Sequence, residues 1–182
     1  MKVSRVFNIS LIIFPLFTLI SVYLSNVALT ITFATITFHF WLRAICGAIF
    51  STIKLTGKER IFNVSDKELK LYEKLGVKNW KDKLPTYKPE LFKERDLNKL
   101  YSNMLHSELV HIAISIFSYT PLLLSIFWSY LHDSIIIFFI TSVLASLLDM
   151  TFVIAQRYNR PRVKHLMSLI VEKHQKSTCK NN

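Results

Sequence analysis

Glycine and cysteine are scarce in this chain, and their scarcity excludes several kinds of active site. The 182 residues include only three glycines and two cysteines. The sequence contains neither a nucleophile elbow nor a glycine-rich phosphate loop. Cys46 lies in an apolar run and Cys179 in a basic tail, so we expect no disulfide, no redox pair and no cysteine metal site. Covalent catalysis through serine and dithiol chemistry therefore both lack support.

Charged residues are nearly missing from four long segments. Residues 6–24, 27–53, 109–130 and 134–155 hold almost no acids or bases, whereas residues 54–99 are densely charged. At about 1.5 Å per residue, each apolar run is long enough to cross a hydrocarbon layer about 30 Å thick. The sequence therefore predicts an all-α integral membrane protein, with about four transmembrane helices and a cytosolic helical insert.

The same blocks predict four parts along the chain. We expect an N-terminal transmembrane hairpin (1–53), a charged cytosolic insert (54–105), a C-terminal transmembrane hairpin with a basic exit motif (106–166) and a basic tail (167–182). The first apolar run follows Lys2 and could be a cleaved signal peptide. No small-x-small cleavage site is evident, so a retained helix is favoured.

Basic residues set the expected orientation and the kind of partner. Lysines and arginines precede the first run, fill residues 54–99 and follow the fourth run, whereas the connections 25–26 and 131–133 contain none. The positive-inside rule then predicts a multi-pass protein with both termini and the insert in the cytoplasm. The net charge of +11 lies beside the apolar runs, which favours anionic lipids or an anionic substrate over nucleic acid.

The charged insert carries local helix signals. Ser65 and Glu68 form a predicted capping box at the start of a short helix, and Gly76 is a predicted C-terminal cap. Trp80, flanked by lysines, fits either an interfacial helix or an ordinary amphipathic surface helix. Asp96 or Asn98 is expected to start the helix that enters the third apolar run.

Ionisable residues lie inside the second and fourth apolar runs, where a charged side chain costs about 2.5–3.5 kcal/mol. His39 and Arg43 are four apart in the second run and share a helical face, and Asp149 lies in the fourth run, seven residues before Gln156. These residues could support a site near the cytoplasmic end of the helices. The alternative is structural: Arg43 and Asp149 pair with each other across two helices.

Glu108 and His111 are a candidate catalytic pair. They are three residues apart on a predicted helix, so Glu108 could orient the imidazole of His111 as a general base. A purely structural histidine is the alternative. His106 and His111 are five apart, which does not fit a zinc pair on one helix, so we expect no metal and no cofactor.

The fourth apolar run ends in a basic motif that is suited to binding an anion at the membrane surface. Its candidate binding residues are Gln156, Arg157, Tyr158, Asn159, Arg160 and Arg162. The alternative is a stop-transfer signal that only fixes topology.

Three motifs together resemble the glycosyl-4,4'-diaponeurosporenoate acyltransferases, small bacterial membrane proteins. They are Asn79-Trp80-Lys81-Asp82-Lys83-Leu84-Pro85, then Ser107-Glu108-Leu109-Val110-His111, then Val153-Ile154-Ala155-Gln156-Arg157-Tyr158-Asn159-Arg160-Pro161-Arg162-Val163. The resemblance covers roughly residues 70–166. This chain departs from the family pattern at four positions. The family pattern has an acidic residue where this chain has Asn103 and a basic residue where it has His106. It has an asparagine where this chain has Asp149 and a proline where it has Thr151.

The resemblance implies a membrane-embedded acyltransferase of the bacterial cell membrane. It would esterify a sugar hydroxyl of a glycolipid, glycosyl-diaponeurosporenoate in the family's own name, with a fatty acyl group from a thioester or a phospholipid. By the same resemblance His111 is the base, the arginines with Asn159 bind the donor, and Arg43 or His39 stabilises the oxyanion. The alternatives are a small membrane methyltransferase or reductase, and a non-enzymatic membrane anchor or immunity-type protein.

Overall fold

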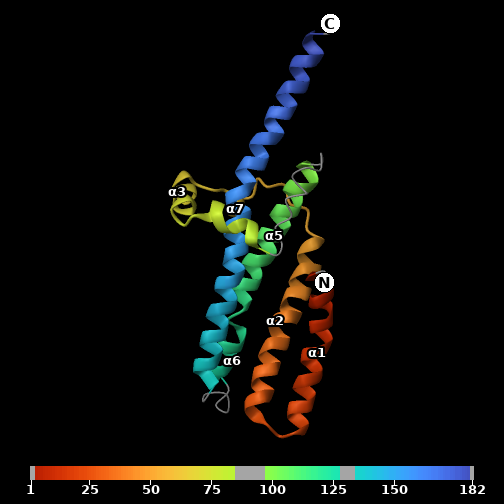
Figure 1. Cartoon of the computed structure of the whole chain (residues 1–182), viewed down its shortest axis with the longest axis vertical. Coiled ribbons are helices and arrows are strands. Elements are labelled where there is room, and N and C mark those ends of the chain that lie inside the picture. The colour runs from red at the N-terminus through yellow and green to blue at the C-terminus, as the bar shows by residue number, and fades with distance from the viewer. Residues whose placement is uncertain (1–2, 85–96, 128–133, 181–182) are drawn as a thin grey trace. The chain divides into compact units, whose positions relative to one another are not determined.

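A computed structural model describes residues 3–84, 97–127 and 134–180, and these residues form helices and no strand (Figure 1). The predicted all-α class is confirmed. In chain order the elements are α1 (Val3–Tyr23), α2 (Val27–Ser51), the 3-10 turn η1 (Arg60–Phe62), α3 (Asp66–Lys74), α4 (Val77–Trp80), the 3-10 turn η2 (Lys81–Lys83), α5 (Leu97–Phe117), α6 (Thr120–Phe127) and α7 (Ile135–Lys180).

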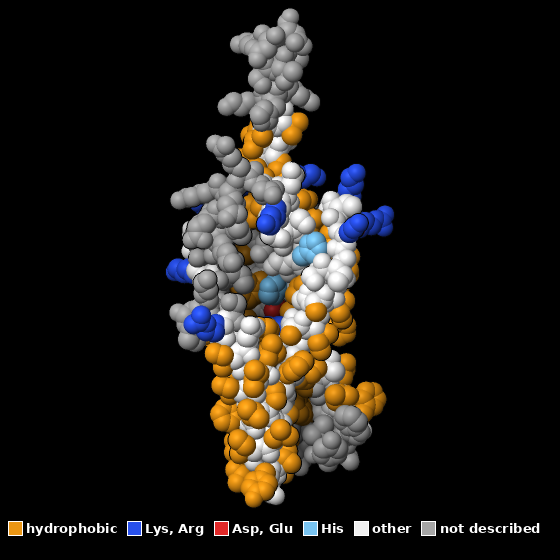
Figure 2. Space-filling model, turned by 90° about the vertical axis from the view of Figure 1, so that its right-hand side faces the viewer, with side chains coloured by type: hydrophobic (Ala, Val, Ile, Leu, Met, Phe, Trp, Pro, Cys, Tyr) orange, Lys and Arg blue, Asp and Glu red, His pale blue; other side chains and the backbone are white. Residues whose placement is uncertain are grey.

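Four helical segments are long and apolar enough to cross a membrane, as predicted. They are Arg5–Tyr23, Val27–Ser51, Leu97–Phe127 and Ile135–Glu172. Many of their large hydrophobic side chains are exposed, and Figure 2 shows such side chains covering the visible surface of the apolar helices. Exposed apolar surface of this extent fits helices that face lipid. The cytosolic placement of the charged insert and of both termini stays a prediction.

Two of these helices extend well beyond the apolar runs. α5 begins at Leu97, next to the predicted start at Asn98, while Asp96 lies outside the described residues. α7 continues through the basic motif, with Pro161 inside it, as far as Lys180. The third span is interrupted after Phe117 and resumes in α6, where Pro121 takes a first-turn position that needs no backbone donor. The connection 131–133 also lies outside the described residues.

The helices form two compact units, each built from two segments of the chain. Unit 1 consists of Met1–Thr52 and Val110–Met150, and unit 2 of Ile53–Leu109 and Thr151–Asn182. Both units therefore take part of α5 and part of α7. The predicted division into four consecutive parts stays a prediction.

In unit 1, α1 and α2 form a hairpin with a very short turn (Figure 1). Ser25 adopts a left-handed conformation with φ 51°, and the side chain of Asn26 caps α2 by accepting from the backbone N–H of Leu29 at 3.0 Å. The rings of Phe14 and Phe40 stack across the two helices with centroids 5.3 Å apart. A three-residue turn thus suffices to reverse the chain between the first two candidate spans.

The rest of unit 1 packs through small and apolar side chains. Cys46 of α2 is buried against Ala113 and Ile114 of α5. Ser115 of α5 and Ser146 of α7 are joined by a hydrogen bond of 2.6 Å between their hydroxyls. Small polar residues of this kind let two helices approach closely in an apolar environment.

In unit 2, the predicted caps at Ser65 and Gly76 are confirmed, and the Glu68 carboxylate binds Arg157. Ser65 Oγ accepts from the backbone N–H of Glu68 at 3.2 Å at the start of α3, and Gly76 follows the end of α3 with φ 62°. Trp80 packs in the apolar cluster that includes Tyr72 of α3 and Tyr158 of α7. The insert is therefore folded onto the helix that carries the basic motif.

Candidate active site

Unit 1 has a buried ionic centre at Asp149, whose side chain is fully buried on α7. Its Oδ1 lies 2.8 Å from Nδ1 of His111 on α5, and its Oδ2 lies 2.5 Å from Nη2 of Arg43 on α2. The predicted alternative of an Arg43–Asp149 pair across helices is confirmed. One carboxylate thus accepts from two basic side chains that belong to two other helices.

The position of Asp149 gives His111 an acidic partner that the sequence pattern did not single out. The sequence predicted that Glu108 orients His111, whereas the two oxygens of Glu108 face Arg157 and Arg160. Asp149 lies thirty-eight positions further along the chain than His111. The signal for it was the energetic cost of a carboxylate inside an apolar run, which requires a partner.

The contact with Asp149 assigns the tautomer of His111. A carboxylate oxygen only accepts, so Nδ1 of His111 carries the hydrogen that Asp149 binds. A neutral imidazole protonated at Nδ1 keeps its basic lone pair on Nε2. The pair therefore has the arrangement in which a carboxylate orients a histidine for proton transfer.

His39 lies one helical turn before Arg43 and is half-buried. Nη1 of Arg43 donates to the backbone carbonyl of His39 at 3.4 Å. Both ring nitrogens of His39 are buried and have no hydrogen-bond partner among the described residues. Buried polar atoms are nearly always paired, so an unpaired ring in a span suggests a position where a polar group of a substrate is received.

Unit 1 contains an apolar cavity of about 330 Å³, and part of its lining comes from α2, the helix that carries His39. Its lining includes Ile31, Thr35 and Phe38 of α2, Pro121 and Leu124 of α6, and Phe138 of α7. Thr35 is one helical turn before His39 and shares its face. The cavity can accept a hydrocarbon chain.

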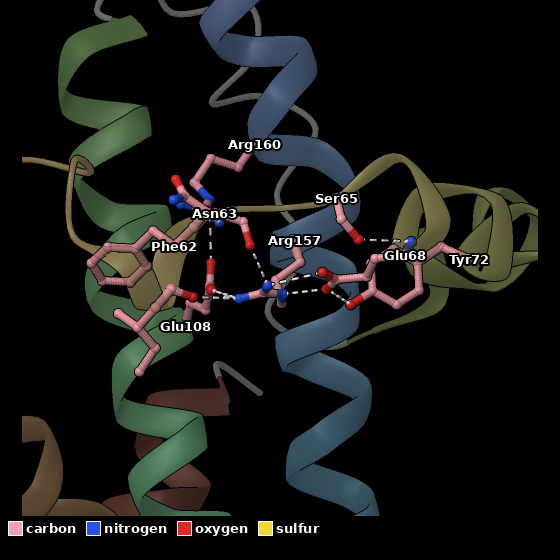
Figure 3. Close-up of polar contacts among 9 residues, drawn as sticks. Phe62, Asn63, Ser65, Glu68, Tyr72, Glu108, Arg157 and Arg160 are labelled. Carbon is pink, nitrogen blue, oxygen red and sulfur yellow. Dashed lines mark hydrogen bonds and ion pairs between the residues drawn. The ribbon is translucent and has the colours of Figure 1, made fainter.

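Arg157 is the centre of a second ionic network, in unit 2 (Figure 3). Its Nε and Nη2 bind the two oxygens of Glu68 at 2.5 and 3.0 Å, and its Nη1 binds Oε1 of Glu108 at 2.8 Å. The backbone carbonyls of Ile61 and Asn63 accept from Nη1 and Nη2 at 2.7 and 2.8 Å. A guanidinium has five N–H donors, so every donor of Arg157 is used within the chain.

Arg160 is buried beside the same network, with 4% of its side chain exposed. Its Nη2 donates to the carbonyl of Phe62, and its guanidinium carbon lies 5.1 Å from the centre of the Phe62 ring. Its Nε is 3.2 Å from Oε2 of the fully buried Glu108, an ion pair without hydrogen-bond geometry. Glu108 thus balances the charge of two arginines.

The other predicted binding residues have different environments. Arg162 is exposed, stacks 4.0 Å above the ring of Tyr158 and donates to the Tyr158 hydroxyl at 2.6 Å. Tyr158 and Asn159 are buried, and Gln156 is half-buried. Trp80 belongs to the packing around Tyr158 and donates from Nε1 to the Leu75 carbonyl at 3.2 Å. The basic motif therefore has internal faces as well as an exposed one.

Arg157 changes the pKa of an acidic side chain in the insert. Its hydrogen bonds lower the pKa of Glu68, and the hydroxyl of Tyr72, which donates to Glu68, adds to that effect. Burial and the neighbouring Glu68 carboxylate raise the pKa of Tyr72 to about 12. Glu68 is therefore ionised and Tyr72 neutral around pH 7.

Among the described residues, no group of three or more His, Cys, Asp or Glu side chains could hold a metal ion.

The helical fold with four candidate membrane spans, and the pair of half-buried His111 and buried Asp149, define a membrane protein with a candidate site for proton transfer. The chain matches the family model of glycosyl-4,4'-diaponeurosporenoate acyltransferase (CrtO) over residues 49–169. That segment is most of the chain, so the protein belongs to this acyltransferase family and is an enzyme of acyl transfer. The match includes Glu108, His111, Asp149 and the basic motif, whereas His39 and Arg43 precede it. No curated protein and no solved structure matches the chain.

Proposed function

We propose that this acyltransferase esterifies a sugar hydroxyl of a membrane glycolipid with a fatty acyl group, using His111 as the general base. The contact between His111 and the buried Asp149 carries the proposal. The family name supports a glycosylated carotenoid acid as the acceptor. In this scheme Glu108 has a positioning role, because it holds Arg157 and Arg160.

The proposed reaction needs only one base. Nε2 of His111 takes the proton of the sugar hydroxyl while its oxygen attacks the acyl carbonyl carbon, and Asp149 stabilises the imidazolium that forms. The tetrahedral intermediate then breaks its bond to the donor's thiol or alcohol. The leaving group takes the proton from His111, which returns the base to its starting state.

His39 is a candidate donor to the oxyanion of that intermediate. Arg43 is already bound to Asp149, whereas the ring nitrogens of His39 have no partner within the described part of the chain. An N–H donor in a buried site stabilises a developing oxyanion far more than one in water. Between the two predicted candidates, the contacts therefore favour His39 over Arg43.

The apolar cavity of unit 1 supports a lipidic substrate. Thr35 in its lining is eight residues before Arg43, which corresponds to about 12 Å along the helix axis. A hydrocarbon chain that lies in the cavity could therefore place its polar end at the level of Arg43 and His39. We assign the cavity to the acyl chain or to the polyene of the acceptor.

Replacement of His111 by alanine tests the proposal. Membranes that contain His111→Ala should esterify the glycolipid about 10²–10⁴-fold more slowly, the usual contribution of a general base. Mass spectrometry of the extracted lipids measures the added acyl mass. His165→Ala is the control, because His165 is exposed on α7. Full esterification by His111→Ala would disprove the assignment of the base.

The orientation is a separate proposal, supported by the distribution of lysine and arginine. Both termini and residues 54–105 are proposed to face the cytoplasm of a bacterial cell. Reporter fusions at residue 85 and at the C-terminus, active only in the cytoplasm, should both give signal. A silent fusion at either position would contradict this orientation.

A further inference from the structure

We infer that a cavity in unit 2, lined by Asn63, Arg160 and Lys164, binds a phosphate group of the acyl donor, and that Arg157 does not. This inference rests on the proposed function, since it names the part of the donor that the enzyme recognises. It also assigns different roles to two arginines of the basic motif: Arg157 stabilises the fold, and Arg160 binds the ligand.

The cavity has a volume of about 210 Å³ and a mixed polar lining. Its walls include Gly57, Phe62, Asn63, Tyr101, Arg160 and Lys164. Arg160 and Lys164 are four residues apart on α7 and therefore share a helical face. Among the described residues, no acidic side chain is part of the lining. Two cations, an amide and a phenol around one space form a suitable environment for an anion.

Arg160 has donor capacity that remains available to a ligand. Its Nη2 is bound to the Phe62 carbonyl and its Nε faces Glu108, but Nη1 has no partner within the described part of the chain. Nε lacks hydrogen-bond geometry but is engaged in its ion pair with Glu108. An arginine buried to this extent usually has its donors satisfied, so the unused Nη1 points to a missing anionic acceptor.

Arg157 is excluded from this role by its own contacts. All five of its N–H donors bind acceptors of the chain, which are two carboxylates and two carbonyls. A phosphate could reach it only by displacing Glu68 or Glu108. Each displaced carboxylate would then lose a charge-assisted hydrogen bond.

The part of the lining formed by Gly57 and Tyr101 is fixed by the fold. Gly57 has φ 74°, and a Cβ at this position would lie 2.5 Å from the hydroxyl of Tyr101. The turn is held by the Glu59 carboxylate, which accepts from the backbone N–H and the hydroxyl of Thr56 at 3.0 and 2.9 Å. A glycine is required here both by the backbone conformation and by the close approach of the phenol. The cavity is therefore part of the fold.

Phosphate is the anion that suits an acyl donor. Carrier thioesters and phospholipids both present phosphate esters, and both fit a lining of one guanidinium and one ammonium group. Lys164 and Asn63 of the lining are both exposed, so the cavity can be reached from solvent. A phosphate can enter there while the rest of the donor stays outside.

Binding of inorganic pyrophosphate to the full chain in detergent tests the inference without turnover. Lys164→Gln and Asn63→Asp should each weaken the affinity at least about tenfold, the usual loss for a charge-assisted contact. Lys70→Gln and Asn79→Asp, two exposed positions of the same unit outside the cavity, are the matched controls and should bind as the unmodified protein does. Equal affinity in all four variants would overturn the inference.

Turnover with three donors identifies the source of the phosphate. Lys164→Gln should raise KM about tenfold for either a coenzyme A thioester or a phospholipid, whichever is the donor, and leave KM for an N-acetylcysteamine thioester unchanged. An equal rise with the phosphate-free thioester would overturn the inference. Failure of the proposed function appears separately, as turnover that survives His111→Ala with every donor.

Discussion

In the described part of the chain, each unit contains a buried ionic centre, and the two centres have opposite charge patterns. In unit 1 the carboxylate of Asp149 accepts from His111 and Arg43. In unit 2 the guanidinium of Arg157 donates to Glu68, Glu108 and two backbone carbonyls. The first is an anion between two bases, and the second is a cation among acceptors.

The two centres also differ in the chemistry that we propose for them. A neutral histidine that donates from Nδ1 has its basic lone pair on Nε2, which is why we propose proton transfer at the centre of Asp149. Arg157 has no donor left, so its centre can only hold the chain segments that it joins. Charged motifs in one protein can therefore differ in kind, and the count of used donors separates them.

The largest expected effect is the loss of activity on removal of Asp149. Asp149→Ala removes both the acceptor for Nδ1 of His111 and the charge that stabilises the imidazolium, so kcat should fall about 10²–10⁴-fold. Asp149→Asn keeps an oxygen acceptor and should retain a larger share of the rate. Initial rates of esterification in isolated membranes measure both.

Stability must be controlled in this comparison, because either change leaves Arg43 without its counter-ion. Arg43→Gln added to each variant removes that unpaired charge. If activity then returns to the original rate, Asp149 acts only as the partner of Arg43 and the catalytic reading of unit 1 fails.

Arg157→Lys should mainly affect folding. A lysine keeps the charge but cannot make the paired contacts with Glu68, so we expect a loss of about 3 kcal/mol, at the lower end for breaking a buried ion pair. Thermal unfolding in detergent, followed by circular dichroism, measures this loss. The two units would not differ as described if Arg157→Lys left the melting temperature unchanged and abolished donor binding.

A smaller loss of folding stability is expected at low pH. Arg157 lowers the folded-state pKa of Glu68 below its ordinary value, so the ionised form is favoured by folding. Its contribution is complete above the ordinary carboxyl range and is lost as the pH falls through the lowered pKa. Glu68→Gln should flatten this part of the stability profile between pH 6 and pH 3, roughly one unit either side of the carboxyl range.

A matched variant makes the acid experiment specific. Glu73 is exposed on the same helix, so Glu73→Gln should leave the profile as it is. A profile that is identical in both variants would mean that Glu68 is not the group that titrates.

The smallest effect is expected at the exposed end of the basic motif. Arg162 stacks on Tyr158 and donates to its hydroxyl, so Tyr158→Phe should cost only about 0.5–1 kcal/mol. The same unfolding measurement detects it. A loss as large as that of Arg157→Lys would contradict the division of the motif into internal and exposed faces.

The helices and their local signals could be predicted from the sequence. Long uncharged runs predict spans because an apolar helix satisfies its own backbone, and Ser65 and Gly76 mark the ends of a helix through contacts with near neighbours. These features depend on residues close together in the chain. The cost of an isolated charge also predicted the pairing of Arg43 with Asp149.

The partners of His111 and Arg157 could not be predicted in the same way. Glu108 was the nearest acid to His111 in sequence, but the choice of Asp149 depends on how α5 and α7 pack. Two acceptors of Arg157 are the backbone carbonyls of Ile61 and Asn63, and no side-chain pattern encodes a carbonyl. The saturation of Arg157 therefore becomes visible only in three dimensions.

The pair of Arg43 and Asp149 has a consequence for how this family diversifies. Asp149 lies inside the segment that the family model matches, and Arg43 lies before it. A buried charge is tolerated only with its counter-charge, so the two positions should change together over evolutionary time. Members with a neutral residue in place of Asp149 are not expected to retain an arginine in the preceding hairpin. Covariation between these two positions would record a selective link between the preceding hairpin and the segment that the family model matches.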